Sequence, residues 1–431
     1  MCCTSATMFS MSTKKLCVGL IIYILVFPGN VALAKNDSDT LELLTHQITA
    51  LEKYIARTNL RMGLSEAVAL PREDMRDVIK NGVAWLVEAQ EGTGHFAYEY
   101  LPYSDEYKYG DNIVRQAGAL YALTEVARRD AVGDMHRSAA IEEAVVFFEN
   151  ASLAHTYEGK EVRCLARNKD SKTCILGATA LALAGVLGYV ESDPAKASTY
   201  EHLIEGYISF IMASKKEAAG FRDQYRIGTG FVGDKESSFS NGEALLALVR
   251  YYQYSPDQEV KRIIDETFSY LEVIPFDTPL YLWAMAALKD MHALWPSEKY
   301  TTYGEKFTAW RMGSLYRSHG TTRNYCASTE GLASAYTLIE DSASKEVLER
   351  LRTEIDFWNL KNVDLQITSN DLYRLATRED GTIFLEFVQN LNKSRGGFLT
   401  AENELTQRID FTQHCVSTYV QTLVDIDGQL L

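Results

Sequence analysis

The 431-residue chain lacks several features that would place it in a class at once. It has only eight prolines and no low-complexity tract, which argues against a disordered chain or a flexible linker. It has no block of basic residues, and its net charge is −15. Because nucleic acids and anionic membranes bind clustered Lys and Arg, we expect neither as a partner.

The common catalytic motifs are also missing. The sequence contains no G-x-S-x-G elbow, Walker A loop, H-E-x-x-H pair or G-x-G-x-x-G turn after a strand. Serine hydrolases of the elbow type, P-loop proteins, zinc proteases and dinucleotide-binding enzymes are therefore not indicated. The eight His are scattered along the chain, so we expect neither a dedicated metal site nor a cofactor.

The first 34 residues differ from the rest of the chain. Lys14 and Lys15 precede an apolar run at 16–27, and the small-residue stretch A-L-A follows at 32–34. This arrangement is typical of a secretory signal peptide, and the run is short for a membrane span of about 20 residues. We expect cleavage before Lys35 and a periplasmic or secreted protein. An uncleaved signal anchor is the alternative.

Cleavage would leave four cysteines, Cys164, Cys174, Cys326 and Cys415. Cys164 and Cys174 bracket a polar turn that could close a hairpin, and an oxidising compartment would permit a disulfide between them. Four isolated buried thiols are an equally good interpretation. Neither pair has the spacing of zinc ligands.

Helical periodicity dominates from residue 75 onward. The run 177–186 is apolar almost all round and suits an inner layer of helices, whereas 345–359 is charged on one face and suits an outer layer. Strand patterns occur only at 160–166 and, more weakly, at 365–368. Helices are predicted at 75–90, 112–129, 137–152, 174–190, 197–213, 241–254, 258–272, 278–293, 329–340, 344–358 and 410–425, with further candidates near 300–312 and 380–392.

The pattern predicts an all-α protein in which residues 71–431 form one (α/α) toroid domain of about five to six helical hairpins. The segments share no strict repeat length, so an open solenoid is less well supported. A short amphipathic helix is expected within 35–70, where Leu41, Leu44, Ile48, Leu51 and Ile55 form a stripe. This stripe could dimerise or dock on the toroid, and we expect docking.

Aromatic residues are concentrated in the loop 91–110, which holds five Tyr, one Phe and one His. Aromatic rings stack on the apolar faces of sugars, and Tyr hydroxyls add hydrogen bonds. We predict that His95, Tyr98, Tyr100 and Tyr103 line a sugar-binding site. The alternative is that this loop packs its aromatics on the end of the toroid.

Two polar clusters open predicted helices. Asp111 and Asn112 can cap the helix that follows, and Arg115 stands where a guanidinium pairs with a carboxylate or binds a ligand. We include all three among the substrate-binding candidates.

Near the C-terminus, Asp410 and His414 are four residues apart and share one helix face, so the carboxylate could orient the imidazole for proton transfer. Arg408 and Gln413 flank them as further binding candidates. A helix-dipole role for Asp410 and a core role for His414 are the alternatives.

Glu243 and Glu330 stand at the starts of two apolar helices. A carboxylate in a first turn stabilises the helix dipole. Carboxylates at facing rims would instead suit an inverting glycosidase, in which they are about 6.5–9.5 Å apart. We count Glu243, Glu330, Asp410 and His414 as the catalytic candidates.

Several of these motifs together resemble the six-hairpin glycosidase-like superfamily of bacterial (α/α) toroid proteins, near its glucuronyl C5-epimerase-like branch. The resemblance extends over about residues 75–428, although the long connector 359–397 departs from a regular hairpin pattern. It rests on D-N-x-x-R-x-A-G at 111–118, G-E-A-L-L-A-L at 242–248, E-G-L-x-x-A-Y at 330–336, G-G-F at 396–398 and R-I-D-F-x-Q-H at 408–414.

The resemblance implies a glycan-facing cleft at one end of the toroid, but it transfers no catalytic residue, because the superfamily includes hydrolases, lyases and epimerases. We expect an exported glycoside hydrolase, epimerase or polysaccharide lyase that acts on an envelope or extracellular glycan by acid/base chemistry. The alternative is a non-catalytic glycan-binding or polysaccharide-assembly protein. In either case Arg115, Glu330, Asp410 and His414 should surround one concavity, with Tyr98 or Tyr100 at its lip.

Overall fold

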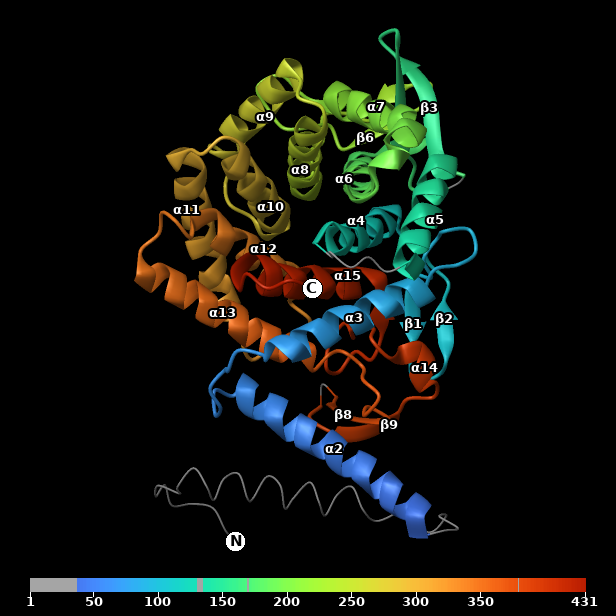
Figure 1. Cartoon of the computed structure of the whole chain (residues 1–431), viewed down its shortest axis with the longest axis vertical. Coiled ribbons are helices and arrows are strands. Elements are labelled where there is room, and N and C mark those ends of the chain that lie inside the picture. Colours follow the sequence, from blue (N-terminus) through green and yellow to red (C-terminus); the bar gives the residue numbers. More distant parts are fainter. Residues whose placement is uncertain (1–36, 130–134, 169, 379) are drawn as a thin grey trace.

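The computed structural model describes residues 37–129, 135–168, 170–378 and 380–431, in which two layers of helices form a ring (Figure 1). The predicted signal segment, 1–34, lies outside the described residues. Outer and inner helices alternate along the chain. The outer helices are α3 (Arg72–Glu88), α5 (Met135–Ala151), α7 (Ala197–Ser214), α9 (Gln258–Leu271), α11 (Glu298–Tyr316) and α13 (Lys345–Val363). The inner helices are α4 (Ile113–Arg129), α6 (Leu176–Ser192), α8 (Ser238–Tyr254), α10 (Thr278–Leu294), α12 (Cys326–Ile339) and α15 (Ile409–Val420).

The inner helices close on themselves. Each packs against the next along the chain, and the last, α15, packs against both α12 and α4 (Figure 1). The toroid prediction is thus confirmed with six hairpins, and closure rules out an open solenoid. Because every inner helix follows an outer one, all six inner helices begin at the same end of the ring. We call this end the mouth.

Composition separates the two layers. Residues 176–190 of α6 are all buried, and small side chains let its neighbours approach: a Cβ added at Gly185 would lie 2.7 Å from Leu120 Cγ on α4. The outer helix α9 instead buries one stripe that includes Val260, Ile264 and Phe268. A helix buried all round belongs inside a double layer, and an amphipathic one belongs on its surface.

Short antiparallel strands occupy the long connectors that lead into the mouth. The sheets have the orders β10-β1-β2, β3-β4, β5-β6-β7 and β8-β9, and β1 pairs Glu99 with Arg408 of β10. The strand predicted at 160–166 is confirmed as β4, whereas 365–368 contributes only a bridge from Gln366 to Phe398. The strands are β1 (Glu99–Leu101), β2 (Glu106–Lys108), β3 (Ser152–Tyr157), β4 (Lys160–Leu165), β5 (Thr173–Ile175), β6 (Gln224–Arg226), β7 (Gly230–Phe231), β8 (Tyr373–Thr377), β9 (Ile383–Phe387) and β10 (Gln407–Arg408).

The helix predicted near 380–392 is wrong. This segment forms β9, followed by the short helix α14 (Leu391–Ser394). β9 pairs with β8 along its length, with Leu385 opposite Leu375. The run I-F-L-E-F is rich in β-branched and aromatic residues, which suit a strand. The candidate near 300–312 is confirmed as part of α11. The remaining short elements are the 3₁₀ helix η2 (Pro194–Lys196) and the π-helix η3 (Gln421–Ile426).

The N-terminal helix α2 (Asp37–Arg61) docks on the β8–β9 hairpin, outside the ring (Figure 1). The Tyr54 hydroxyl is 2.8 Å from Thr377 Oγ1, and Arg57 Nη1 donates to Asp364 Oδ2 at 3.1 Å. The expected docking is therefore seen in the second half of the helix. Farther toward its N-terminus, Leu41 and Ile48 remain 67% and 48% exposed.

Two disulfides connect the four cysteines. Cys164 pairs with Cys174 and joins β4 to β5, whereas Cys326 pairs with Cys415 and joins α12 to α15. The interpretation as four isolated thiols is wrong. The second pair was not predicted from the sequence, because its partners are far apart along the chain and meet only when the ring closes.

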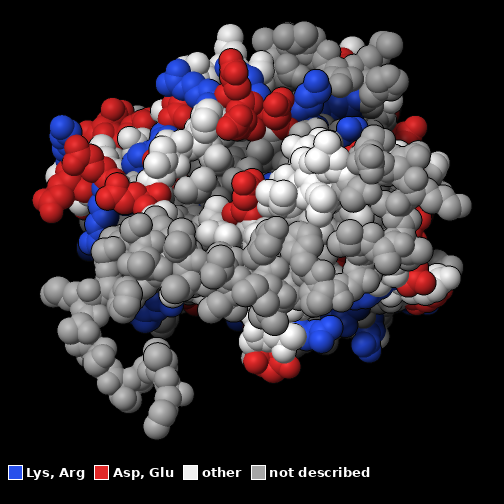
Figure 2. All heavy atoms as spheres, turned by 90° about the horizontal axis from the view of Figure 1, so that it is seen from below, with Lys and Arg blue, Asp and Glu red and all other residues white. Residues whose placement is uncertain are grey.

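The described surface carries charges of both signs. Figure 2 shows acidic and basic side chains interspersed over the part of this face that is not grey. Among the described residues, no helix has the length and apolar character needed to cross a membrane.

Candidate functional site

The mouth is built from connector loops that are hydrogen-bonded to the inner helices. Each of three loops contains a Gly-Phe or Gly-x-Phe turn whose Phe N–H donates to a side chain in the first turns of the following inner helix. The pairs are Phe96 with Gln116 at 2.9 Å, Phe221 with Asn241 at 2.9 Å, and Phe398 with Thr412 at 3.1 Å. Tyr98 and Asp223 each stand two residues after such a Phe, so these bonds position both side chains at the mouth.

Arg115, Arg408, Asp410 and Tyr98 form one cluster. Asp410 is paired with Arg115 on α4 and accepts two bonds from Arg408, at 2.9 and 2.6 Å. Arg115 Nη1 also donates to the Tyr98 hydroxyl at 3.1 Å, and both guanidinium groups lie within 6 Å of the Tyr98 ring centre. Two cations share one carboxylate here. The Arg115 side chain is 34% exposed, so it can also reach a ligand.

His414 finds a different partner from the one expected. Its Nδ1 lies 2.8 Å from Oε2 of Glu330 on the neighbouring helix α12, whereas Asp410 is held by the two arginines. The prediction that Asp410 orients His414 is therefore wrong about the partner. Glu330 is almost fully buried, and burial raises its pKa although His414 opposes that shift. A carboxylate at Nδ1 favours the tautomer whose Nε2 can accept a proton.

An aromatic pair fills the centre of the ring next to this pair. Tyr121 of α4 and Trp283 of α10 meet edge to face, with their ring centres 5.8 Å apart. Trp283 also lies 6.0 Å from the His414 ring. Both aromatic residues are about 4% exposed, while the His414 side chain is 19% exposed. The aromatic pair is thus buried inside the ring, and the imidazole beside it is partly exposed.

Glu243 lies on another inner helix, α8, and is buried close to Gly177 of α6. A Cβ at Gly177 would overlap the Glu243 carboxylate. Burial and the nearby Asp223 carboxylate raise the pKa of Glu243 to about 8. Asp223 itself accepts a 2.5 Å hydrogen bond from the Ser240 hydroxyl. A neutral carboxylic acid and an accepting carboxylate therefore lie side by side at the mouth.

Asp223, Tyr121 and Trp283 were missed in the sequence. For Asp223 a signal existed: F-x-D at 221–223, just after a Gly, repeats the spacing of F-x-Y at 96–98. Nothing in the sequence marks Tyr121 or Trp283, because they meet across the closed ring.

The other candidates from the 91–112 region form a network of their own. His95 Nε2 is 3.3 Å from Asp111, and this contact raises the pKa of His95 despite its partial burial. Asp111 also accepts from Gln116 at 3.0 Å. The Asn112 side chain accepts from the backbone N–H of Val114 at 3.1 Å, as a capping residue does.

Tyr100 and Tyr103 make their observed contacts outside the Arg115 cluster, and their place in a sugar site stays a prediction. The Tyr100 hydroxyl donates to Asp105 at 2.9 Å, and its ring packs on Tyr107. Tyr103 is partly buried, with its hydroxyl buried near Arg374, and burial raises its pKa. Tyr100 is 1% exposed, as the alternative interpretation of aromatics packed on the toroid end expects.

Gln413 packs between α15 and α4. A Cβ at Gly118 would overlap its amide group, and its Oε1 is buried without a hydrogen-bond partner in the described structure. The small residue at 118 therefore makes room for this side chain.

Arg115, Glu243, Glu330, Asp410 and His414 thus occupy the first two turns of four inner helices at one end of the ring. A concavity that all of them line stays a prediction. Within the described residues, no group of three potential metal ligands comes together.

Buried ion pairs connect the inner helices at the opposite end of the ring. Arg250 contacts Glu125 at 3.3 Å and Asp290 at 2.6 Å, and Arg129 joins Glu125 at 2.8 Å to Asp425 at 3.0 Å. Burial opposes the ionisation of Glu125, but Arg250 and Arg129 lower its pKa to about 2. Among the described residues, these charged groups pair with one another. We therefore assign this end a structural role.

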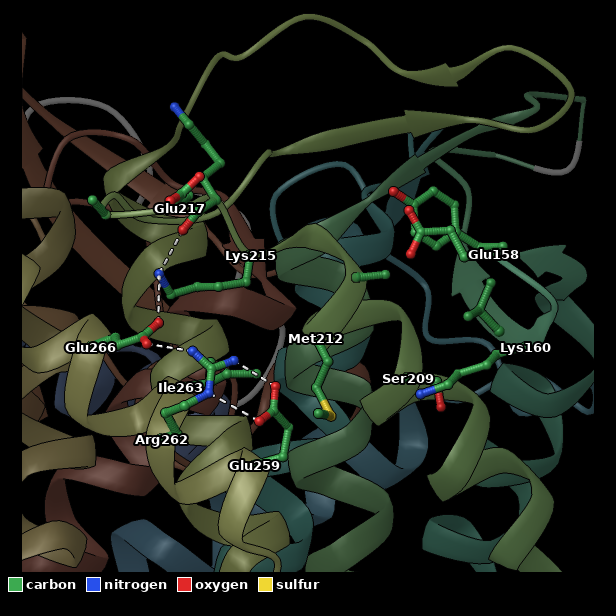
Figure 3. Close-up of a pocket in the computed structure, with 15 residues that line it drawn as sticks. Glu158, Lys160, Ser209, Met212, Lys215, Glu217, Glu259, Arg262, Ile263 and Glu266 are labelled. Carbon is green, nitrogen blue, oxygen red and sulfur yellow. Dashed lines mark hydrogen bonds and ion pairs between the residues drawn. The ribbon is translucent and has the colours of Figure 1, made fainter.

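A pocket of about 850 Å³ lies on the outer wall, between α7, α9 and the β3–β4 hairpin (Figure 3). Its charged groups are largely paired. Arg262 contacts both Glu259 and Glu266, and Lys215 lies 3.9 Å from Glu266. None of the predicted site residues lines it, so its size alone does not make it the candidate site.

No family model matches the chain, and no curated protein matches it in sequence. Solved structures match its fold. An α-mannanase of glycoside hydrolase family 76 from Bacteroides thetaiotaomicron shares 10% identity, covering 86% of this chain and 100% of its own, with a TM-score of 0.57. The cellobiose 2-epimerase from Spirochaeta thermophila shares 12% identity, with coverages of 83% and 97% and a TM-score of 0.54. An unsaturated glucuronyl hydrolase specific for heparin shares 11% identity, with coverages of 84% and 100% and a TM-score of 0.56. At these identities the likeness establishes the fold alone: this chain is an (α/α) toroid of six helical hairpins.

Proposed function

We propose that the protein is a carbohydrate-active enzyme that transfers protons to and from a glycan at the mouth of the toroid. The observation that carries the proposal is the His414–Glu330 pair, with Nδ1 and Oε2 at 2.8 Å and the imidazole partly exposed. A buried carboxylate that fixes the tautomer of an accessible imidazole is the arrangement a general base needs.

The remaining residues have complementary roles. Glu243, with a pKa of about 8, stays protonated at neutral pH and supplies a general acid. Arg115, Arg408 and Tyr98 bind sugar hydroxyls or a sugar carboxylate. Glu330 is already hydrogen-bonded to His414. Glu243 and Glu330 therefore do not provide the two unpaired carboxyl groups that a glycosidase uses. The site therefore favours epimerisation or elimination over hydrolysis.

The proteins with a similar fold support a glycan as the substrate. Their names describe a mannanase, a sugar epimerase and a glucuronyl hydrolase. The signal-like segment at 1–34 favours export. We therefore propose that the glycan belongs to the envelope or the extracellular space. N-terminal sequencing of the exported protein should give a start near Lys35, and a retained run at 16–27 would contradict export with cleavage.

A glycan array followed by mass spectrometry of the bound glycans tests the proposal. Product should form with the native protein and be lost in His414→Ala and Glu330→Gln. His202→Ala is the matched control, because His202 also contacts a glutamate, Glu149, at 2.8 Å but lies on the outer helix α7. Binding without any product would favour the alternative, a non-catalytic glycan-binding or polysaccharide-assembly protein.

A further inference from the structure

The chain reaches α15 from α12 through the longest connector between any two helices of the ring. Residues 364–408, including the β8–β9 hairpin, separate α13 from α15, whereas residues 317–325 are enough to connect α11 to α12. The separation of α12 and α15 therefore depends on the contacts that α15 makes with its neighbours, which are α12, α4 and α3.

Besides their packing, three covalent or hydrogen-bonded contacts join these two helices near the mouth. The Cys326–Cys415 disulfide is covalent. Thr418 Oγ1 lies 2.9 Å from the Cys326 carbonyl oxygen and 2.8 Å from the His414 carbonyl oxygen. The third contact is the bond between His414 and Glu330.

The disulfide lies next to that bond on both helices. Cys415 directly follows His414, and Cys326 precedes Glu330 by four residues, one turn on the same face of α12. Asn324 holds the disulfide from the loop side, with Nδ2 3.4 Å from Cys415 Sγ and 3.1 Å from the Leu399 carbonyl oxygen. A shift of α15 by about 1 Å would break a 2.8 Å hydrogen bond, because such bonds weaken beyond about 3.2 Å.

We propose that the Cys326–Cys415 disulfide is a positioning element for His414, holding α15 at the distance from α12 at which Glu330 reaches the imidazole Nδ1. The proposal deepens the proposed function, since it concerns the group assigned there as the general base. With the disulfide in place, Glu330 keeps the proton on Nδ1 and leaves the Nε2 lone pair free. Without it the helices separate, and the proton moves to Nε2, which imidazole favours in water.

The two disulfides of the chain provide a matched comparison. Cys326→Ala/Cys415→Ala removes the one between α12 and α15, and Cys164→Ala/Cys174→Ala removes one that joins connector strands. Both variants and the native protein are labelled with ¹⁵N-histidine. Two-dimensional NMR then reads the tautomer of His414 from its ring nitrogen shifts, with His414→Gln identifying the signal. Circular dichroism checks that each variant is folded.

We expect the Nδ1–H tautomer in the native protein and in Cys164→Ala/Cys174→Ala, and a shift toward the Nε2–H tautomer in Cys326→Ala/Cys415→Ala. An unchanged tautomer in the folded Cys326→Ala/Cys415→Ala variant would overturn the proposal. The same shift in both variants would also overturn it, because it would reflect general loosening of the fold. So would a native protein that lacks the Nδ1–H tautomer.

If Cys326→Ala/Cys415→Ala does not fold, the folded Cys164→Ala/Cys174→Ala protein is reduced instead. Dithiothreitol supplies two electrons and two protons, the sulfur–sulfur bond breaks to two thiols, and the reagent closes to its cyclic disulfide. The tautomer should change on reduction, and no change would contradict the proposal. The measurement uses no substrate, so a failure to find a glycan product would affect only the proposed function.

Discussion

At Glu243, burial and a neighbouring carboxylate act in the same direction. Its pKa rises from 4.5 to about 8 in the folded protein, so the folded state binds a proton that the unfolded state releases. Folding stability should therefore fall as pH rises from about 4.5 to about 8, and the whole loss should be present above that range. Urea unfolding of the native protein and Glu243→Gln at pH 5, 7 and 9 measures this.

Glu243→Gln cannot ionise, so its stability should change less over this range than that of the native protein. Asp223→Asn, which removes the neighbouring charge but keeps the burial, should give an intermediate pH dependence. Parallel curves for the native protein and Glu243→Gln would show that this carboxyl is not the group responsible.

The identity of the site residues could be predicted better than their partners. Four-residue spacing placed Asp410 and His414 on one helix face, and both are indeed at the mouth. Asp410 nevertheless pairs with Arg408 and Arg115, because a guanidinium on each side offers a stronger charge-assisted contact than an imidazole. The partner of His414 comes from another helix, which a local pattern cannot reveal.

At the scale of elements, the two disulfides should differ in their effect on stability. A disulfide constrains the unfolded chain more when it closes a longer loop, and the separations are 89 residues for Cys326–Cys415 and 10 for Cys164–Cys174. The chain-entropy model gives about 4–5 and about 3 kcal/mol. Urea unfolding of the two double-alanine variants should therefore show the larger loss for Cys326→Ala/Cys415→Ala, and the reverse order would contradict this account.

The docked helix α2 gives a second comparison of elements. Arg57, whose side chain is 3% exposed, pairs with Asp364 and Glu402. Arg57→Ala leaves one buried and one partly buried carboxylate without this partner and should lower the free energy of unfolding by about 3 kcal/mol. Leu41→Ala, at an exposed position of the same helix, should change it by less than about 0.5 kcal/mol. Limited proteolysis at 62–71 should accelerate only in the Arg57 variant.

Helical periodicity predicted the elements well where each helix packs along its whole length. All twelve helices of the two layers coincide with predicted segments, with shifts of a few residues at their ends. The failure at 380–392 has a physical cause: in so short an apolar run, periods of 2 and 3.6 are hard to tell apart. Pairing with β8 makes this segment a strand, and a local helical pattern cannot reveal that pairing.

At the scale of the molecule, closure brings the candidate residues to one end of the ring. The inner helices begin at one end, so residues from 98 to 414 meet there although no local pattern connects them. Closure also brings together the partners that the sequence could not assign: Glu330 with His414, Tyr121 with Trp283, and Cys326 with Cys415.

The end of the ring opposite the mouth provides the last prediction. Glu125 is buried there among Arg250 and Arg129, which overcome its burial and lower its pKa from 4.5 to about 2. The folded state therefore favours the ionised carboxylate. The stability that this group contributes should be complete above about pH 4.5 and should be lost as pH falls toward 2.

Glu125→Gln should be less stable than the native protein at pH 7, by about 3 kcal/mol, because it removes a buried partner of Arg250. It should also lose part of the native acid sensitivity, so the two stability curves should approach each other as pH falls from 4.5 toward 2. Urea unfolding at pH 2.5, 3.5, 4.5 and 7 measures both effects. Glu259→Gln is the control: its pair with Arg262 lies on the exposed face of α9, where solvent screens the interaction. Equal effects of the two substitutions would mean that the buried ion pairs at this end stabilise the fold no more than an exposed pair does.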